Sequence, residues 1–341
     1  MHTADYLRAS ESSLSPSGVV VTGASGWLGS RVVDHLLSIG MPVISVGRSQ
    51  PDRQGIRHIG IDLEAGTREP AGLEEVLALA QQWAVIHCAG LAHVDRETAV
   101  IRDRLRRTNA DGTVRMLEMC RRLGIVRFVY VSSTAVYGWA HRREVVAANE
   151  EEALFPETAY GESKLAGERA VMASGLDWRI ARLATMFGEG DHANFLRMAK
   201  AVKARRFLLP GDAAALKSCI PVTLAARSLA RFAALEAPNH RLVNLTLASQ
   251  PTLHEICLRL SLACHSPLPM SLPVQMMAAA ARLGDLVGRL GIRPPLNSEI
   301  LTKLTTSTAV NSERATELFP ETALTTFESA MAECGDYYAK C

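Results

Sequence analysis

The chain has 341 residues, of which 48% are hydrophobic and 21% are charged, a composition typical of globular proteins rather than of disordered or fibrous ones. Its 37 lysines and arginines nearly balance its 35 aspartates and glutamates, and a net charge of +2 argues against nucleic acid as a partner. No apolar run approaches the roughly 18 residues of a membrane-spanning helix, and residues 1–17 lack the apolar core of a signal peptide, so we expect a cytoplasmic protein without a membrane partner.

Short apolar strands alternate with longer helices over the first half of the chain. After a loose tail over residues 1–17, the pattern predicts strands at 19–21, 42–46, 59–61, 84–87, 127–131 and 178–181, and helices at 27–39, 100–123 and 158–173. Such alternation is typical of an α/β fold in which a doubly wound parallel sheet, here of the Rossmann type, is covered by helices on both faces. Ligands of these folds bind at the carboxyl ends of the strands.

The second half of the chain is less regular, because prolines interrupt short helical segments from about residue 183 onward. An apolar strand is still predicted at 242–247. We therefore expect a dinucleotide-binding domain with the catalytic residues at 18–182 and a smaller, interleaved substrate-binding domain at 183–341. Part of 217–247 is expected to return to the first domain.

A glycine-rich turn lies between the first predicted strand and the first predicted helix. The glycines of Thr22-Gly-Ala-Ser-Gly-Trp-Leu-Gly29 permit a tight turn, the close approach of a pyrophosphate and tight packing of helix on strand. The helix N-terminus offers N–H groups and the positive end of its dipole to phosphates. The sequence therefore predicts a dinucleotide site whose contacts in this turn are Gly23, Ser25, Gly26, Trp27, Leu28 and Gly29.

The end of the second predicted strand bears on the choice of dinucleotide. An acidic residue there would bind the adenine ribose 2′-hydroxyl of NAD, but Gly47 is followed by Arg48 and Ser49. A guanidinium can hold a phosphate by two hydrogen bonds, so NADP is favoured over NAD, with a merely solvated Arg48 as the alternative. Past the third strand, Asp62 is predicted to bind the adenine amine and Leu63 is predicted as a further cofactor contact.

Tyr160 and Lys164 lie four residues apart on a predicted helix and therefore share one face. An ammonium beside a phenol favours the phenolate and lowers the tyrosine pKa from about 10, which makes it an acid or base near neutrality. Ser133, after the fifth strand, can hydrogen-bond the same substrate oxygen. The spacing alone occurs by chance on many helices, but after a dinucleotide turn it predicts Ser133, Tyr160 and Lys164 as catalytic residues.

With these motifs together, the chain resembles an extended short-chain dehydrogenase/reductase of the NAD(P)-dependent epimerase/dehydratase superfamily over about residues 18–190. The matching segments are Thr22–Gly29, His87-Cys-Ala-Gly90, Asn109-Ala-Asp-Gly-Thr113, Val131-Ser-Ser-Thr-Ala-Val-Tyr-Gly138, Tyr160-Gly-Glu-Ser-Lys164 and Arg182–Gly188. The sequence departs from the family pattern at Leu183, where proline is usual, and at Phe187, where tyrosine is usual.

The resemblance implies a role for each matched residue. Tyr160 exchanges a proton with the substrate oxygen, Lys164 lowers its pKa and holds the nicotinamide ribose, and Ser133 positions the substrate, with Thr134 as the less favoured hydroxyl. Ala89 and Gly90 line the cofactor, and Asn109 orders the central helix. It also implies a homodimer through the helices at 100–123 and 158–173.

The resemblance implies substrate contacts as well, in the segment where nucleotide-sugar enzymes bind the substrate pyrophosphate. Asn194 matches the asparagine of that segment, and Lys217 lies where those enzymes carry a basic residue before their next strand, although the lysine also fits a solvated surface. Thr223 and Pro221 depart from the family pattern, which has an aspartate and an aromatic residue there. A nucleotide sugar is thus the expected substrate, and its identity stays open.

Three other features favour structural interpretations. The segment Met270–Ile292 is rich in Met, Ala and Leu and is interpreted as a buried amphipathic helix, with an apolar pocket wall or membrane docking as alternatives. The seven arginines between Arg102 and Arg122 are interpreted as a solvated face. Seven scattered cysteines without a C-x-x-C pair, and histidines without ligand spacing, predict reduced thiols and no metal site.

The favoured function is therefore hydride transfer on a nucleotide-activated sugar, with reduction of a keto-sugar preferred to epimerisation because Arg48 favours NADP. Dehydration is disfavoured, because Thr134-Ala135 follow Ser133 where dehydratases carry acidic residues. One alternative is an NADPH-dependent reductase of a hydrophobic, sterol-like or flavonoid-like ketone. Another is a cofactor-sensing protein without activity, although Ser133, Tyr160 and Lys164 are all present.

Overall fold

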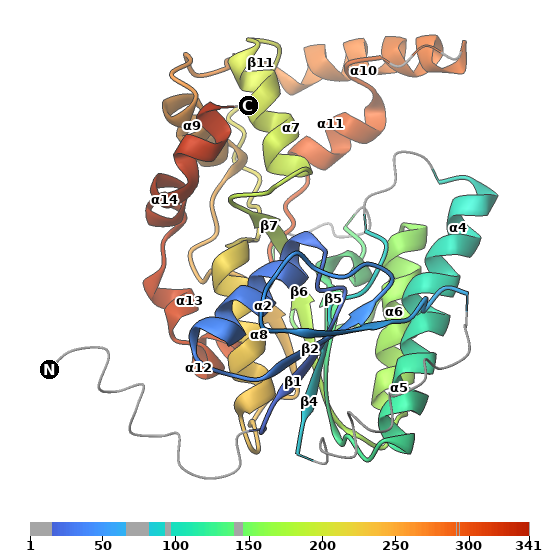
Figure 1. Ribbon diagram of the computed structural model, residues 1–341. Helices are drawn as coiled ribbons and strands as arrows, with labels where there is room; N and C mark the ends of the chain where they lie inside the picture. Colours follow the sequence, from blue (N-terminus) through green and yellow to red (C-terminus); the bar gives the residue numbers. More distant parts are fainter. Residues whose placement is uncertain are drawn as a thin grey trace, which may run out of the picture. The chain divides into compact units, whose positions relative to one another are not determined.

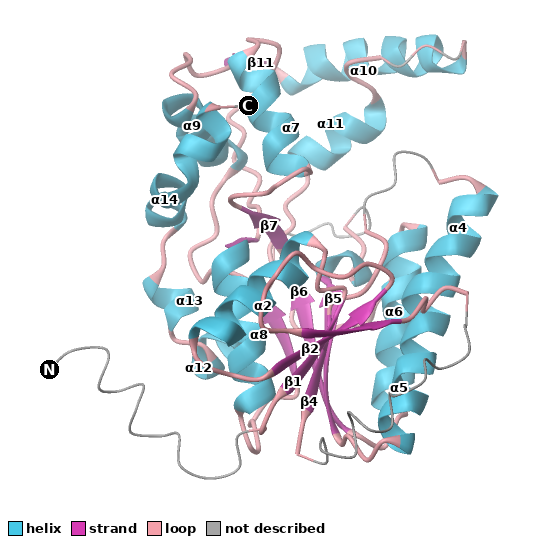
Figure 2. Cartoon of the chain, in the orientation of Figure 1, coloured by secondary structure: helices cyan, strands magenta, loops and turns pink. Residues whose placement is uncertain are grey.

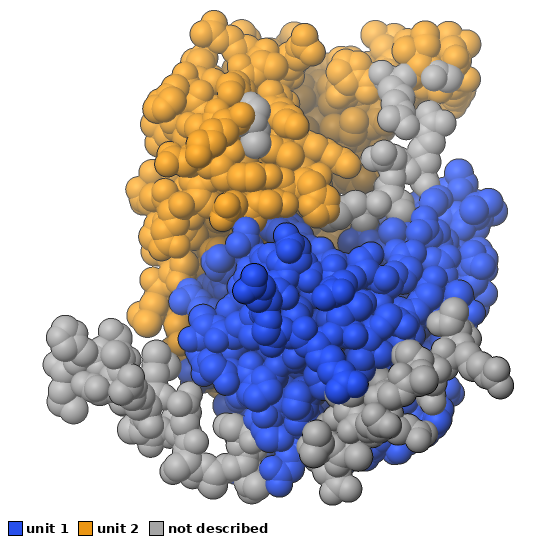
Figure 3. Space-filling view, in the orientation of Figure 1, with its two compact units in different colours: residues 1–136, 158–183, 223–243 blue, residues 137–157, 184–222, 244–341 orange. Residues whose placement is uncertain are grey.

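The computed structural model of the protein describes residues 16–65, 82–92, 97–139, 146–290, 292 and 294–340. The chain divides into two compact units (Figure 3): unit 1 contains residues 1–136, 158–183 and 223–243, and unit 2 contains 137–157, 184–222 and 244–341. Residues 137–157 thus fall in unit 2, although the predicted first domain includes them. The predicted tail over 1–17 lies almost wholly outside the described residues, and the functional domain boundaries stay a prediction.

Unit 1 is built on a central sheet, and its described strands follow the order β10-β6-β5-β4-β1-β2-β3. All the neighbouring pairs from β3 to β6 are parallel. The strands are β1 (Val19–Thr22), β2 (Val43–Gly47), β3 (Arg57–Gly60), β4 (Ala84–His87), β5 (Arg127–Ser133), β6 (Asp177–Leu183) and β10 (Leu242–Leu245). The predicted doubly wound parallel fold is confirmed.

Helices cover both faces of this sheet (Figures 1 and 2), with α2 and α8 on one face and α5 and α6 on the other. Their bounds are α2 (Trp27–Ser38), α4 (Ala99–Leu105), α5 (Gly112–Arg122), α6 (Ala159–Met172) and α8 (Val222–Ala234). On the α5 side, Met116 and Leu117 pack in one core with Val20, Ile44 and Val85 of the strands. Because both faces are covered, the strands are apolar at successive positions rather than at alternate ones.

The predicted continuous helix over 100–123 is interrupted in the structure. A π-helical turn, η1 (Arg106–Asp111), separates α4 from α5. Within this turn the side chain of Asn109 accepts a hydrogen bond from Leu91 N at 2.7 Å and donates to Leu91 O and Ser163 Oγ, both at 2.9 Å. The amide therefore ties three segments together, a tertiary role that helical periodicity does not reveal.

Unit 2 contains short strands and most of the later helices. Its elements are β7 (Thr185–Phe187), α7 (Asn194–Lys203), β8 (Leu208–Pro210), β9 (Cys219–Pro221), α9 (Leu253–Ala263), β11 (Met270–Leu272), α10 (Val274–Arg289), α11 (Ser298–Thr305), α12 (Glu313–Leu318), α13 (Glu321–Leu324) and α14 (Phe327–Ala339). Strand β7 pairs with β9, and β8 pairs with β11, both in parallel. Among the helices described here, none is both long and apolar enough to cross a bilayer.

The interpretation of Met270–Ile292 as a buried amphipathic helix holds for only one face of α10. Strand β11 and helix α10 share this segment, and within α10 only Met277, Ala281 and Gly284 are buried. Most of the other apolar side chains of α10 are exposed. Periodicity alone does not distinguish an apolar face that packs on its own protein from one that faces outward.

Candidate active site

The candidate site of unit 1 lies at the carboxyl ends of β1 and β4. Strands β2 and β3 extend the sheet on one side of β1, and β4 and the later strands extend it on the other side, so the order of the strands reverses between β1 and β4. Thr22 at the end of β1 lies opposite His87 at the end of β4. The predicted glycine turn follows β1, and Ala89-Gly90 follow β4. Thr22 Oγ1 accepts a hydrogen bond from Ala89 N at 3.1 Å, which joins the two strand ends at the position where such sheets bind ligands.

The glycine turn has the geometry that a dinucleotide requires. Gly23 has a φ of +66°, and a Cβ at Gly29 would lie 2.2 Å from Gly23 O, so a larger residue fits neither position. Helix α2 begins after Gly26, which has no side chain to cap it, and its first turn holds no acidic residue. Ser25 and Gly26 are exposed, while Leu28 is buried. These residues fit a pyrophosphate at the N-terminus of α2.

The predicted adenine contacts lie at the ends of the next two strands. Arg48 and Ser49 follow β2 and are both exposed, and Asp62 follows β3. One carboxylate oxygen of Asp62, Oδ1, accepts hydrogen bonds from Glu64 N at 2.9 Å and Ala65 N at 3.3 Å. Asp62 therefore shapes its own loop, and its predicted bond to adenine stays a prediction.

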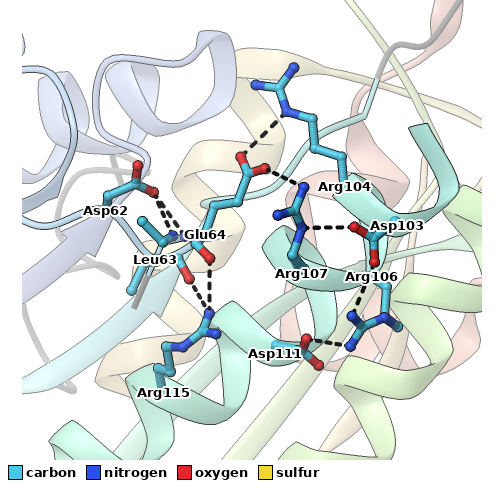
Figure 4. A network of polar contacts seen from close by, with 10 residues as sticks. Asp62, Leu63, Glu64, Asp103, Arg104, Arg106, Arg107, Asp111 and Arg115 are labelled. Carbon is cyan, nitrogen blue, oxygen red and sulfur yellow. Dashed lines mark hydrogen bonds and ion pairs between the residues drawn. The ribbon is translucent and has the colours of Figure 1, made fainter. Parts of the chain in front are cut away.

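A network of ion pairs holds this loop against the arginine-rich helix (Figure 4). Glu64 binds Arg104 Nε at 3.3 Å and Arg107 Nη2 at 3.5 Å, and Arg115 donates to the carbonyl oxygens of Leu63 and Glu64. Asp103 and Asp111 pair with the next arginines along the helix. Acidic side chains thus neutralise much of this arginine-rich face, and the arginine side chains paired with them are exposed, which agrees with its interpretation as a solvated face.

His87 is buried between the end of β1 and helix α5, where it contacts Thr22 and Thr113. Thr113 Oγ1 donates to Asn109 O at 2.7 Å, so it accepts from His87 Nε2 at 3.1 Å. His87 Nδ1 is then left to accept from Thr22 Oγ1 at 2.8 Å. Burial first, and the charge of Lys164 second, lower the pKa of His87 to about 3, so the imidazole is neutral. It acts as a fixed connector rather than as an acid or base.

The three predicted catalytic residues lie together at the carboxyl end of β5. Ser133 is the last residue of β5, and Tyr160 and Lys164 occupy one face of α6, whose N-terminus is capped by Thr158 through its bond from Gly161 N at 3.1 Å. Ser133 and Tyr160 are hydrogen-bonded through their side chains. A Cβ at Gly90 would lie 3.7 Å from Lys164 Nζ, so the lysine borders the predicted cofactor wall.

The electrostatics of this group differ from the prediction. Lys164 Nζ lies over the ring of Tyr130, 4.5 Å from its centroid. Burial raises the pKa of Tyr160 above its usual value, and the bond to Ser133 offsets part of that rise. Burial also lowers the pKa of Lys164 to about 8. The prediction that Lys164 lowers the pKa of Tyr160 is therefore not met in this structure, because burial dominates.

Sequence reasoning missed a buried charged group beneath the catalytic residues. Glu168, one helical turn beyond Lys164, binds Arg182 of β6 through Nε–Oε1 at 3.0 Å and Nη2–Oε2 at 2.8 Å. Ser132 Oγ donates to Glu168 Oε1 at 2.5 Å, and all three residues are almost fully buried. The sequence signal for Glu168 is its four-residue spacing from Lys164, which places both residues on the same face of α6. The group ties α6 to β5 and β6, next to Ser133.

In unit 2, the predicted substrate residue Asn194 is the first residue of α7 and is exposed. The buried carboxylate of Asp191 accepts hydrogen bonds from Ala193 N at 2.7 Å and Leu196 N at 2.8 Å, so it caps this helix. Tyr338 of α14 donates to Asp191 Oδ2 at 3.2 Å. Asn194 therefore begins a helix whose N-terminus is already occupied by the carboxylate of Asp191.

Lys217, the second predicted substrate residue, is engaged by its own chain. Its ammonium donates to Lys303 O at 2.8 Å and to Thr306 O at 2.6 Å, at the C-terminal end of α11. Burial lowers its pKa to about 8. Two backbone carbonyls at a helix C-terminus favour a cation there, so Lys217 caps α11.

In the described parts of both units, no group of three or more His, Cys, Asp or Glu side chains could hold a metal ion. Six of the seven cysteines are described, and all six are free thiols. Burial raises the pKa values of Cys88 and Cys120 to about 12, so neither is a reactive thiolate near neutrality.

Comparison with known proteins connects this site with a family. A model of the NAD dependent epimerase/dehydratase family matches residues 19–225. The chain is 32% identical over 184 residues to a dTDP-glucose 4,6-dehydratase of Streptomyces griseus, covering 50% of this chain and 54% of that protein. It is 31% identical over 193 residues to UDP-glucose 4-epimerase 4 of Oryza sativa subsp. japonica, covering 51% and 50%. The chain thus spans about half the length of the curated relatives it matches.

Solved structures share the fold over almost the whole chain. MoeE5 in complex with UDP-glucuronic acid and NAD superposes with a TM-score of 0.71 at 24% identity, covering 95% of this chain and 99% of that chain. UDP-glucuronic acid 4-epimerase from Bacillus cereus in complex with NAD gives a TM-score of 0.70 at 16% identity, with the same coverages. At these identities the likeness shows the fold alone.

Proposed function

Because the chain belongs to the NAD dependent epimerase/dehydratase family, we propose that it is an enzyme that transfers a hydride between a nicotinamide cofactor and a carbon of a nucleotide-activated sugar. The observation that carries this proposal is the grouping of Ser133, Tyr160 and Lys164 beside Gly90 at the carboxyl edge of the sheet. The relatives and neighbours named above act on or bind nucleotide sugars, which supports the substrate class.

The proposed roles follow from protonation and position. When bound, the nicotinamide supplies or accepts the hydride. Tyr160, whose pKa is raised, is a neutral phenol near pH 7 and can give a proton to the substrate oxygen, as net reduction of a ketone requires. Ser133 hydrogen-bonds Tyr160 and can orient the same oxygen, and Lys164 supplies a positive charge at the cofactor wall.

The substrate class is tested by ligand protection. A nucleotide that binds only the folded protein raises the midpoint of thermal unfolding, and a nucleotide-sugar enzyme should be protected by at least one of UDP, dTDP, GDP and CDP in the presence of cofactor. Absence of protection by all four would contradict the proposal. It would favour the alternative of a hydrophobic ketone as substrate. One argument for that alternative is an apolar pocket wall at Met270–Ile292, and it is weakened because many apolar side chains of α10 are exposed.

We further propose that the cofactor is NADP and the reaction a reduction, on the basis of Arg48 at the end of β2. The solved neighbours are complexes with NAD, so their cofactor argues against the NADP that Arg48 favours. The identity of the bound cofactor can be measured directly. Mass spectrometry of cofactor released from freshly purified, denatured protein should find an empty site or partial NADP. Near-stoichiometric NAD would contradict both the NADP assignment and the reduction. It would indicate an epimerase that regenerates its bound NAD in each turnover.

The same residue allows a matched substitution. Arg48→Asp should weaken NADP binding at least about tenfold, because charge-assisted hydrogen bonds contribute about 1.5–3 kcal/mol. The control is Arg57→Asp, which makes the same change at an exposed arginine at the start of β3 and should leave binding unchanged. Calorimetric titration with NADP and NAD measures both variants. Equal weakening by the two substitutions would indicate a general charge effect and remove Arg48 from the site.

The pH dependence should show the low pKa of Lys164. With a pKa near 8, the lysine is charged below that pH and loses its proton as pH rises, so kcat/KM should fall above about pH 8. Lys164→Arg, which stays charged, should move this fall to higher pH, whatever its absolute rate. A fall at unchanged pH in the arginine variant would show that another group titrates.

A homodimer remains a prediction. Light scattering of the purified protein tests it directly.

A further inference from the structure

Helix α10 of unit 2 has a second apolar face besides the one that packs on its own protein. Its buried residues Met277 and Ala281 pack with Leu301 of α11. A separate stripe with the spacing of one helical face consists of Met276, Ala279, Ala280, Leu283, Leu286, Val287 and Leu290. Met276, Leu283 and Leu290 are 60%, 66% and 77% exposed. The stripe runs for about 21 Å, at 1.5 Å per residue.

Apolar exposure is concentrated in this part of the chain. Nine of the twenty large apolar side chains exposed in the described residues lie within 268–292, so exposed apolar side chains are concentrated in this stretch rather than scattered singly over the chain. Met270 of β11, 69% exposed, precedes the helix, and Ile292, 60% exposed, follows it. Figure 1 shows β11 leading directly into α10 along one edge of unit 2.

The charges on α10 are arranged on a different face from the stripe. Arg282 and Arg289 are exposed and seven residues apart, so they lie two turns apart on one side of the helix, next to Leu283 and Leu286. The single acid of the helix, Asp285, is turned to α11, where it accepts hydrogen bonds from Ser298 N at 3.0 Å and Ser298 Oγ at 2.5 Å. Asp285 also lies close enough to Arg289 to interact with its charge, so the side of α10 next to the stripe is cationic mainly through Arg282, with Arg289 partly offset.

We propose that α10 docks this stripe, lying in the plane of the surface, onto a lipid bilayer that contains anionic phospholipids. A bilayer offers an apolar interior to the aliphatic side chains and phosphates to Arg282 and Arg289. The helix is too short to span the bilayer and therefore lies on it. This departs from the expectation of no membrane partner, which rested on the absence of a spanning segment.

Two other occupants fit the stripe less well. Protein interfaces are anchored by aromatic and arginine side chains in complementary pockets, whereas this stripe is purely aliphatic, with no aromatic and no acidic residue. In an antiparallel two-fold pairing with a second copy, the arginine rows of both helices would fall on the same side and repel. On a planar anionic surface the arginines of α10 are attracted by phosphates and face no second arginine row.

Vesicle binding of the full chain tests the proposal without substrate, so it does not depend on the proposed reaction. The protein should float with vesicles of phosphatidylcholine containing about one third phosphatidylglycerol, and weakly or not at all with pure phosphatidylcholine. Leu283→Gln/Leu290→Gln should lower partitioning at least about tenfold. Arg282→Gln/Arg289→Gln should lower it by up to about 25-fold, that is about fivefold for each charge, on anionic vesicles alone.

The matched control is Ile39→Gln/Leu262→Gln, which removes two side chains that are each 58% exposed outside the stripe. It should bind as the unmodified protein does, and unchanged thermal unfolding of all variants should show that each is folded. Absence of binding to anionic vesicles, or equal losses in the control, would overturn the proposal. A dimer that Leu283→Gln/Leu290→Gln dissociates, without vesicle binding, would assign the stripe to a second copy.

Discussion

Tyr160→Phe is expected to lower kcat at least about 10²-fold while cofactor binding is retained, because the substitution removes only the proton that a general acid supplies. The phenol of Tyr160 is hydrogen-bonded to Ser133 at the carboxyl end of β5, and its raised pKa keeps it protonated near neutrality. Phenylalanine preserves the ring and its packing, so the loss is confined to proton transfer. Steady-state kinetics with a keto-sugar nucleotide, together with a cofactor titration, measure both parts.

Tyr130→Phe is the matched control for this experiment. Tyr130 is fully buried beneath Lys164, and its hydroxyl is hydrogen-bonded to the side chain of Thr113 and lies 3.5 Å from Lys164 O. Removal of that hydroxyl should change kcat by less than about tenfold, since no proton transfer depends on it. If Tyr160→Phe retained turnover near that of the unmodified protein, Tyr160 would not be the acid, and Ser133 would become the leading candidate.

Arg182→Met is expected to reduce the free energy of unfolding by about 3–5 kcal/mol, because it leaves the carboxylate of Glu168 buried without its counter-ion. Arg182 and Glu168 make two hydrogen bonds and are almost fully buried, so neither charge can be solvated in place. Urea unfolding measures the change. The double variant Arg182→Met/Glu168→Gln should recover part of the loss, since it removes the stranded charge.

An exposed ion pair provides the control. Lys303 and Glu299 are four residues apart on α11, and their side chains are 68% and 71% exposed. Lys303→Met should cost no more than about 0.5 kcal/mol, because solvent screens such pairs. Comparable losses for Arg182→Met and Lys303→Met would mean that the buried pair is not a determinant of stability.

The features that the sequence determined are those recorded in local spacing. Alternating apolar strands and amphipathic helices predicted the parallel sheet, and the spacing of Gly23, Gly26 and Gly29 predicted the turn at the switch point. The interval between Tyr160 and Lys164 placed both on one face of α6. Each of these follows from residues close together in the chain, where the geometry of a helix, strand or turn sets the distances.

The tertiary structure decided what depends on burial and on distant partners. Lys217 was predicted as a substrate residue, and its ammonium donates to two carbonyls at the end of α11, more than 80 residues away. Arg182 meets Glu168 only because β6 and α6 pack together, and burial raises the pKa of Tyr160 against the expected effect of Lys164. The outward stripe of α10 has the same periodicity as a buried one. Desolvation and long-range pairing are properties of the folded chain, so local sequence does not determine them.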